Sequence, residues 1–200
     1  NKLEELGYSP VHTFSQNQMT LEKANEYDVI YISEKIYTPD SNIDSIKDTT
    51  AGIIFGETGA ISVFNLANEG NSSSGDKIKA ASGDDPANCR SAILGRLSGE
   101  IKVYNRSSSK IGYGLNVASG CTVVANDTNN RPAIFAIEKG GRTTTKCAAS
   151  RRVYIFMHDH SEEVLTPKGW YLFENAVKWA SNAPEHSIYE ELSCPAGTTQ

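Results

Sequence analysis

The sequence predicts a single α/β domain built around a mostly parallel, doubly wound sheet. Three runs are almost continuously apolar, as strands buried on both faces of a parallel sheet are: DVIYIS (28–33), AGIIF (51–55) and RRVYIFM (151–157). Segments with helical spacing separate them, and this alternation implies right-handed crossover connections. The chain has 200 residues, a length that one hydrophobic core can serve.

The N-terminal third supplies the first helices and strands. LEELGY (3–8) has helical spacing and reaches Gly7, a residue that readily takes the left-handed conformation at a helix end. PVHTF (10–14) is predicted as a short strand. After the strand at 28–33, Ser41 is expected to cap another helix.

The middle of the chain changes character. Residues 68–88 are rich in Gly, Ser, Asn and Asp, and we expect a loop containing one strand, KIKAA (77–81). Hairpins should follow at EIKVYN, CTVVAN and PAIFAIEKG. A C-terminal helix begins at Thr166-Pro167, and its apolar residues recur near the 3.6-residue period: Trp170, Phe173, Val177 and Trp179 or Ala180.

Charge and hydropathy exclude several classes of partner. The formal net charge is -5, and no Lys/Arg cluster exceeds a local pair such as Arg151-Arg152, so nucleic acid is not an expected partner. No apolar run approaches the ~20 residues needed to cross a bilayer. We expect no cofactor and no metal. The expected partners are other copies of the chain, neighbouring domains of the same protein, or glycans.

The cysteines suggest an extracellular or cell-surface location, which the glycosylation motifs merely permit. Four cysteines without C-x-x-C spacing suit two disulfides, predicted as Cys121 with Cys147 and Cys89 with Cys194, although four buried thiols are the alternative. N-x-S/T acceptors occur in polar stretches predicted as exposed loops, a number that chance alone explains: Asn71, Asn105 and Asn126.

Two C-terminal blocks carry a family resemblance. SRRVYIFMHD followed by LTPKGWYLFENAVKWAS resembles the closing strand and helix of class I glutamine amidotransferase-like domains of bacterial secreted proteins. Earlier elements resemble the same group in order, so the likeness covers about nine-tenths of the chain. It implies a flavodoxin-like three-layer sandwich over residues 1–183, with 184–200 as a C-terminal extension tied by Cys194.

The family places a nucleophilic cysteine on the sharp turn that corresponds to FGETGA here. Glu57 occupies that position, and a carboxylate cannot reproduce thiolate attack on an amide. The first strand of the fold is also absent from the sequence. That strand lies inside a 2-1-3-4-5 sheet, so upstream residues or another chain would have to pair with its neighbours.

Polar residues follow three predicted parallel strands, at the edge of the sheet where ligands collect in such folds. They are Glu34, Glu57, and the run His158, Asp159 and His160. Together they could bind a cation or sugar hydroxyls. The simpler interpretations are a solvated turn for His158–His160 and, for Glu57, a carboxylate that accepts backbone N–H groups at a helix start.

Two functions follow from these observations. The first is a non-catalytic extracellular structural or interaction module of a larger surface protein, with possible assembly into a filament or matrix. The second is a carbohydrate-binding or hydrolytic domain that uses the polar edge. Convergence of Glu34, Glu57 and His158 on one cavity would favour the second.

Overall fold

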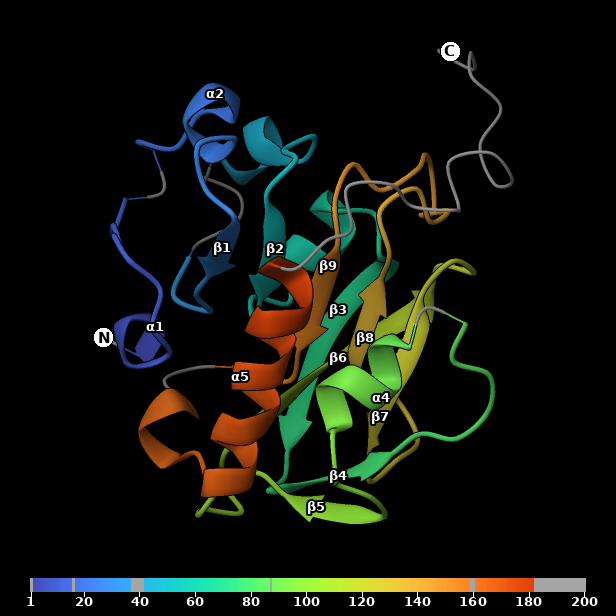
Figure 1. Ribbon diagram of the computed structural model, residues 1–200. Helices are drawn as coiled ribbons and strands as arrows, with labels where there is room; N and C mark the ends of the chain where they lie inside the picture. The colour runs from blue at the N-terminus through green and yellow to red at the C-terminus, as the bar shows by residue number, and fades with distance from the viewer. Residues whose placement is uncertain (1, 16, 37–41, 87, 159–160, 182–200) are drawn as a thin grey trace.

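The centre of the protein is a seven-stranded mixed sheet with the strand order β1-β2-β9-β8-β7-β4-β5 (Figure 1). The computed structural model describes residues 2–15, 17–36, 42–86, 88–158 and 161–181. The strands of this sheet are β1 (Val29–Ile32), β2 (Gly52–Phe55), β4 (Lys77–Ala80), β5 (Glu100–Lys102), β7 (Thr122–Asp127), β8 (Pro132–Ile137) and β9 (Arg152–Ile155). A separate two-stranded ribbon pairs β3 (Ala67–Ser74) with β6 (Lys110–Val117).

The parallel part of the sheet consists of β1, β2 and β9. All four residues of β2 and all four of β9 are buried, which explains their continuous apolar sequences. Gly52 opens β2 where the chain meets the end of α5 (Pro167–Ser181): a Cβ there would lie 2.3 Å from the Ala180 carbonyl oxygen. The glycine therefore allows α5 to lie directly on the parallel strands.

The other strands run antiparallel to their neighbours, from β9 through β8, β7 and β4 to β5. The predicted hairpin between CTVVAN and PAIFAIEKG is confirmed as β7 and β8. Pro132 stands at the first residue of β8, where a missing N–H disturbs the ladder least.

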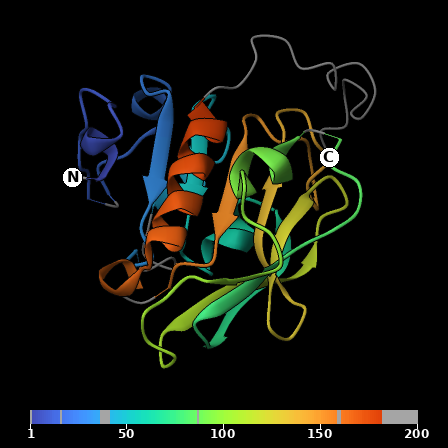
Figure 2. The same cartoon turned by 60° about the horizontal axis from the view of Figure 1, so that its bottom comes forward.

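Different elements cover the two faces of the sheet (Figure 2). One face carries α5 and α4 (Cys89–Leu94), which contact each other. The other face carries α3 (Ala60–Val63) and the β3–β6 ribbon, with β6 lying against β8. The remaining helices are short: α1 (Lys2–Glu5), α2 (Leu21–Ala24), and the 3-10 turns η2 (Asn42–Ile46) and η3 (Ser161–Val164).

The structure confirms the α/β class, the C-terminal helix and the parallel pairing of the three apolar strands. β2 and β9 are buried at every position, whereas β1 is fully buried only at alternate positions. The structure also corrects two sequence-based expectations. Residues 10–14 form no strand, and the segment predicted as a loop at 68–88 contains β3. Glycines and serines in β3 and β6 hide the apolar alternation that usually reveals a strand. The capping role predicted for Ser41 and the C-terminal extension at 184–200 lie outside the described residues.

None of the helices within the described ranges is long and apolar enough to cross a membrane.

Candidate functional site

A cavity of about 610 Å³ runs along β1, between that strand and the extended chain of residues 8–15. Residues 28–34 all contribute to its wall. β1 ends the seven-stranded sheet, so the cavity continues the plane of the sheet beyond its last strand. In Figure 1 the N-terminal chain passes β1 on the side away from β2.

Apolar side chains close the cavity on both faces of that plane. On the α5 side, four side chains pack into the same hydrophobic cluster as Val29 and Tyr31: Leu3, Tyr8, Trp170 and Phe173. On the opposite side, four side chains belong to the cluster of Ile30 and Ile32: Met19, Ile36, Ile43 and Ile46. The cavity therefore lies where both cores of the protein reach the edge of the sheet.

The backbone of β1 also faces this cavity. The amides of Gly52 and Gly56 donate to the carbonyls of Asp28 and Ile32, at 3.0 and 3.2 Å. Backbone groups of alternate strand residues point to opposite sides. Val29 and Tyr31 therefore direct their backbone groups away from β2, toward the cavity.

The N-terminal chain that forms the far wall is fixed at both ends. Lys2 Nζ lies 2.9 Å from Glu174 Oε1, and the hydrogen bond to this carboxylate raises the pKa of Lys2. The Tyr8 hydroxyl lies 2.8 Å from Ser181 Oγ on α5. At the other end, the Tyr27 hydroxyl lies 2.9 Å from His12 Nδ1. These contacts anchor residues 2–12 to the body of the domain.

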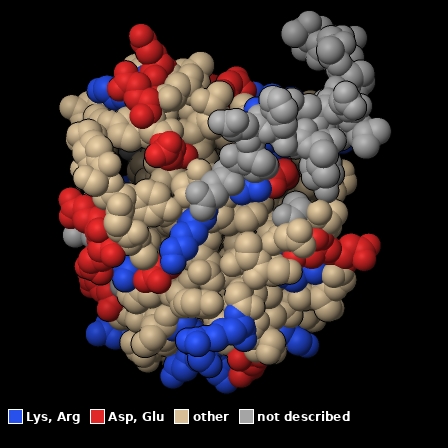
Figure 3. All heavy atoms as spheres, viewed as in Figure 1, with Lys and Arg blue, Asp and Glu red and all other residues tan. Residues whose placement is uncertain are grey.

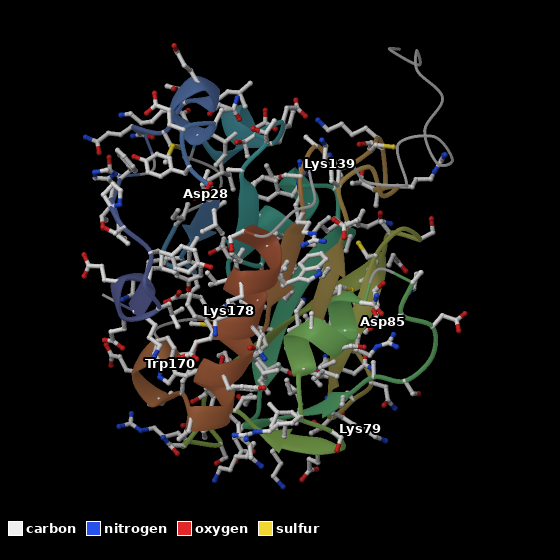
Figure 4. All side chains as sticks on the ribbon, in the orientation of Figure 1. Asp28, Lys79, Asp85, Lys139, Trp170 and Lys178 are labelled. Carbon is white, nitrogen blue, oxygen red and sulfur yellow. The ribbon has the colours of Figure 1, made fainter. Side chains whose placement is uncertain are left out.

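Carboxylates stand at both ends of β1. Asp28 precedes the strand and is exposed, whereas Glu34 follows it and is only 7 % exposed. The Glu34 carboxylate accepts hydrogen bonds from Ser33 Oγ at 3.0 Å and from the Tyr31 hydroxyl at 3.5 Å. Figure 4 shows Asp28 at the start of β1 and Trp170 at the start of α5, two residues that both line the cavity.

The polar edge predicted from the sequence does not converge on this cavity. Glu34 lines it, but neither Glu57 nor His158 is among its lining residues. The backbone amide of His158 donates to Ser161 Oγ at 2.9 Å, as in a turn closed by a hydroxyl. Asp159 and His160 lie outside the described residues. Within the described part of the chain, no group of three or more His, Cys, Asp or Glu side chains is placed to hold a metal ion.

Glu57 lies in the turn between β2 and α3, where its carboxylate accepts the Gly59 amide at 2.8 Å. The β3–β6 ribbon packs directly on this turn. A Cβ on Gly70 would lie 2.1 Å from the Thr58 carbonyl oxygen, and a Cβ on Gly112 would lie 2.0 Å from the Tyr154 hydroxyl. Two glycines are thus needed where the ribbon meets the turn.

The predicted disulfide pairs are wrong. Cys89 and Cys121 are free thiols, and they pack into the clusters on opposite faces of the sheet. Cys147 is disulfide-bonded, no disulfide joins two described residues, and Cys194 lies outside them. Burial raises the pKa of Cys89 and of Cys121 to about 12 in each case.

The three glycosylation motifs differ in their surroundings. Asn71 lies in β3 and Asn126 in β7, so neither occupies the loop expected from the sequence. Asn105 lies in an exposed bend. Residues on paired strands are less accessible than loop residues to a modifying enzyme.

The cavity along β1 was not predicted from the sequence, although one observation pointed toward it. The segment DVIYIS is apolar on both faces, and its strand lies at an edge of the sheet. The residues of the far wall carry no periodic pattern that would reveal their position.

Comparison with known proteins supports the fold. No protein-family model and no curated protein matches the chain. Many solved structures have a similar fold, and two of them illustrate the likeness. A candidate GMP synthase subunit from Thermoplasma acidophilum is 13% identical, with a TM-score of 0.51 over 82% of this chain and 78% of that chain. A protein described as cytoplasmic, from Salmonella typhimurium LT2, is 14% identical, with a TM-score of 0.49 over 83% of this chain and 75% of its own.

The predicted extracellular location loses the support of its cysteine argument. Two of the cysteines on which that prediction depended, Cys89 and Cys121, are free thiols. At such low identity the likeness concerns the fold alone: the chain shares an α/β architecture with a glutamine amidotransferase-type protein.

Proposed function

We propose that this chain is a non-catalytic interaction module built on a flavodoxin-like, three-layer amidotransferase frame. The observation that carries the proposal is the turn after β2. The family resemblance implies a nucleophilic cysteine there, and this chain has Glu57, whose carboxylate accepts the Gly59 amide at 2.8 Å. A carboxylate in that arrangement stabilises the start of a helix.

Neither free thiol supplies a substitute nucleophile. A thiol attacks as the thiolate, and burial raises the pKa of both Cys89 and Cys121 to about 12. At neutral pH both remain protonated.

The packing around the turn supports a structural role. The ribbon approaches Thr58 and Tyr154 so closely that only glycine fits at positions 70 and 112. The Tyr154 side chain is fully buried, and this burial raises its pKa well above the usual value. A phenol held in the protonated form beneath the turn is a poor general base at neutral pH.

Ammonia release from glutamine tests the absence of catalysis. We expect no release above the buffer rate from the wild-type chain, from Glu57→Gln or from Glu57→Ala. Loss of the hydrogen bond to Gly59 should lower the free energy of unfolding of Glu57→Ala by about 0.5–1.5 kcal/mol, the net contribution of a typical hydrogen bond. Glu57→Gln keeps an acceptor oxygen and should lose less. Hydrolysis by the wild type that disappears in Glu57→Gln would overturn the proposal.

A further inference from the structure

We propose that the end of the molecule formed by β4 and β5 binds an acidic segment of another polypeptide, which lies extended across the two strands. This inference rests on the proposed interaction function and names the class of partner. Figure 3 shows basic side chains gathered at the base of the molecule, and Figure 4 labels Lys79 there. The surface is a basic patch of six side chains that are exposed or partly exposed: Lys77, Lys79, Lys102, Arg106, Lys110 and Lys168.

The pairing of β4 with β5 places three of these lysines on one face. Ile78 and Ile101 pair with each other and are buried, at 0 % and 1 % exposed. Side chains alternate between the two faces of a strand, so Lys77, Lys79 and Lys102 project from the opposite face. Lys77 and Lys79 are two residues apart on one strand, which separates them by about 7 Å. Alternate side chains of an extended peptide have the same spacing, so its carboxylates can meet successive ammonium groups.

Tertiary contacts bring the other three members to this end of the sheet. The Gly75 amide donates at 2.9 Å to a carbonyl in the loop that holds Arg106 and Lys110, so this loop lies beside the turn before β4. The start of α5, which carries Lys168, is fixed next to β5 by a hydrogen bond of 2.8 Å from the Thr166 hydroxyl to a β5 carbonyl. Three separate parts of the chain therefore form one positive surface.

The carboxylates near the basic patch are already engaged. Lys77 lies directly opposite Lys102, and like charges in that position destabilise a strand pair. Two ion pairs offset the repulsion, from Lys77 to Glu100 at 2.7 Å and from Lys102 to Asp76 at 3.7 Å. The other four members form no ion pair with a described carboxylate. The patch therefore stays positive in a chain whose formal net charge is -5.

The surroundings of the basic patch favour an acidic peptide over a nucleic acid. β4 (KIKA) and β5 (EIK) contain no aromatic residue on which a base could stack. Duplex DNA carries a charge about every 1.7 Å and extends far beyond a patch of this size, where it would meet a chain of net negative charge. A short acidic segment can end where the patch ends, so it gains the attraction without that repulsion.

Fluorescence anisotropy with labelled ligands tests the inference. The probe peptide alternates glutamate with serine, and its control has glutamine in place of each glutamate. A second comparison uses an oligothymidylate that carries the same number of charges as the probe. At about 50 mM salt, we expect the probe to bind at least about tenfold more tightly than either of them. Raising the salt concentration to about 300 mM should weaken its binding, because exposed charges are screened.

Two double variants of the protein locate the binding surface. Lys79→Glu with Lys110→Glu reverses two exposed members of the patch on different strands and should weaken binding of the probe by about tenfold or more. Arg142→Glu with Lys178→Glu changes the net charge equally at exposed positions outside the patch, and the affinity should stay within about twofold of the wild type. A circular dichroism melt checks that each variant is folded. Arg106→Glu reverses a charge in a loop, so it tests the patch without altering a strand.

Three results would overturn the inference. One is equal binding of the glutamine control, since the carboxylates would then contribute nothing. Another is an oligothymidylate that binds as tightly as the probe or more tightly, which would make the patch a site for a phosphate backbone. The third is an affinity for the probe that Lys79→Glu with Lys110→Glu lowers no more than the control variant does. None of these results affects the glutamine assay, so the two proposals can fail separately.

Discussion

The two edges of the central sheet are built in opposite ways. At one edge, β5 is three residues long, and the β4–β5 pair carries ion pairs between Lys77 and Glu100 at 2.7 Å and between Lys102 and Asp76 at 3.7 Å. Basic side chains gather over this part of the molecule at the base of Figure 3. At the other edge, β1 is apolar on both faces and borders a cavity of about 610 Å³.

This difference shows which edge is protected against further pairing. Short strands and exposed lysines discourage the addition of another strand. The β4–β5 edge has both devices, whereas β1 has no charged residue along Val29–Ile32. The apolar edge at β1 therefore lacks the charged protection that the β4–β5 edge has.

The largest difference between the edges should appear when one buried isoleucine is truncated at each. Ile101 in β5 is 1 % exposed and fully packed, so Ile101→Ala should lower the free energy of unfolding by about 2–5 kcal/mol. Ile30 in β1 is 9 % exposed and already borders the cavity, so Ile30→Ala should cost less. Urea denaturation measures both. An equal or larger loss for Ile30→Ala would show that the β1 edge is as tightly packed as the β5 edge.

Alkaline pH should lower the free energy of unfolding through the two free thiols, Cys89 and Cys121, which both lie close to β7. Unfolded thiols ionise near pH 9 and the buried thiols near pH 12, so the folded protein holds more protons between these values. Stability should therefore fall as the pH rises through this window, by about 1.4 kcal/mol per pH unit for each thiol. The double variant Cys89→Ala, Cys121→Ala lacks both groups, and chemical denaturation from pH 8 to pH 11 should give it a shallower slope than the wild type. Parallel slopes would contradict the assignment.

The smallest effect on the monomer should come from removing the lysines that protect the β4–β5 edge. Lys77→Val with Lys102→Val breaks only exposed ion pairs, and we expect no measurable change in melting temperature. The change should appear in self-association, because an uncharged edge strand pairs more readily with another copy. Sedimentation velocity at rising concentration measures this. Lys139→Val and Lys178→Val, on other elements, serve as the matched control for lost charge.

Much of the fold could be predicted from the sequence where burial is complete. DVIYIS, AGIIF and RRVYIFM are apolar at almost every position because both of their faces are covered, and that pattern is local. The helix at Pro167–Ser181 shows its buried face through Phe173 and Val177 at helical spacing. The β3–β6 ribbon was not predictable in this way, since its glycines are required by contacts with Thr58 and Tyr154, which are distant in the sequence.

The candidate site also has features that could be predicted from the sequence and features that could not. The amino-acid pattern alone places Glu57 in the turn after β2 and shows that β1 is apolar on both faces. The position of β1 at the end of the sheet, the far wall of the cavity at residues 8–15, and the placement of Cys89 and Cys121 on opposite faces became visible only in the folded chain. A strand's apolar pattern records which of its faces are buried, whereas its neighbour in the sheet is chosen by backbone groups that every residue shares.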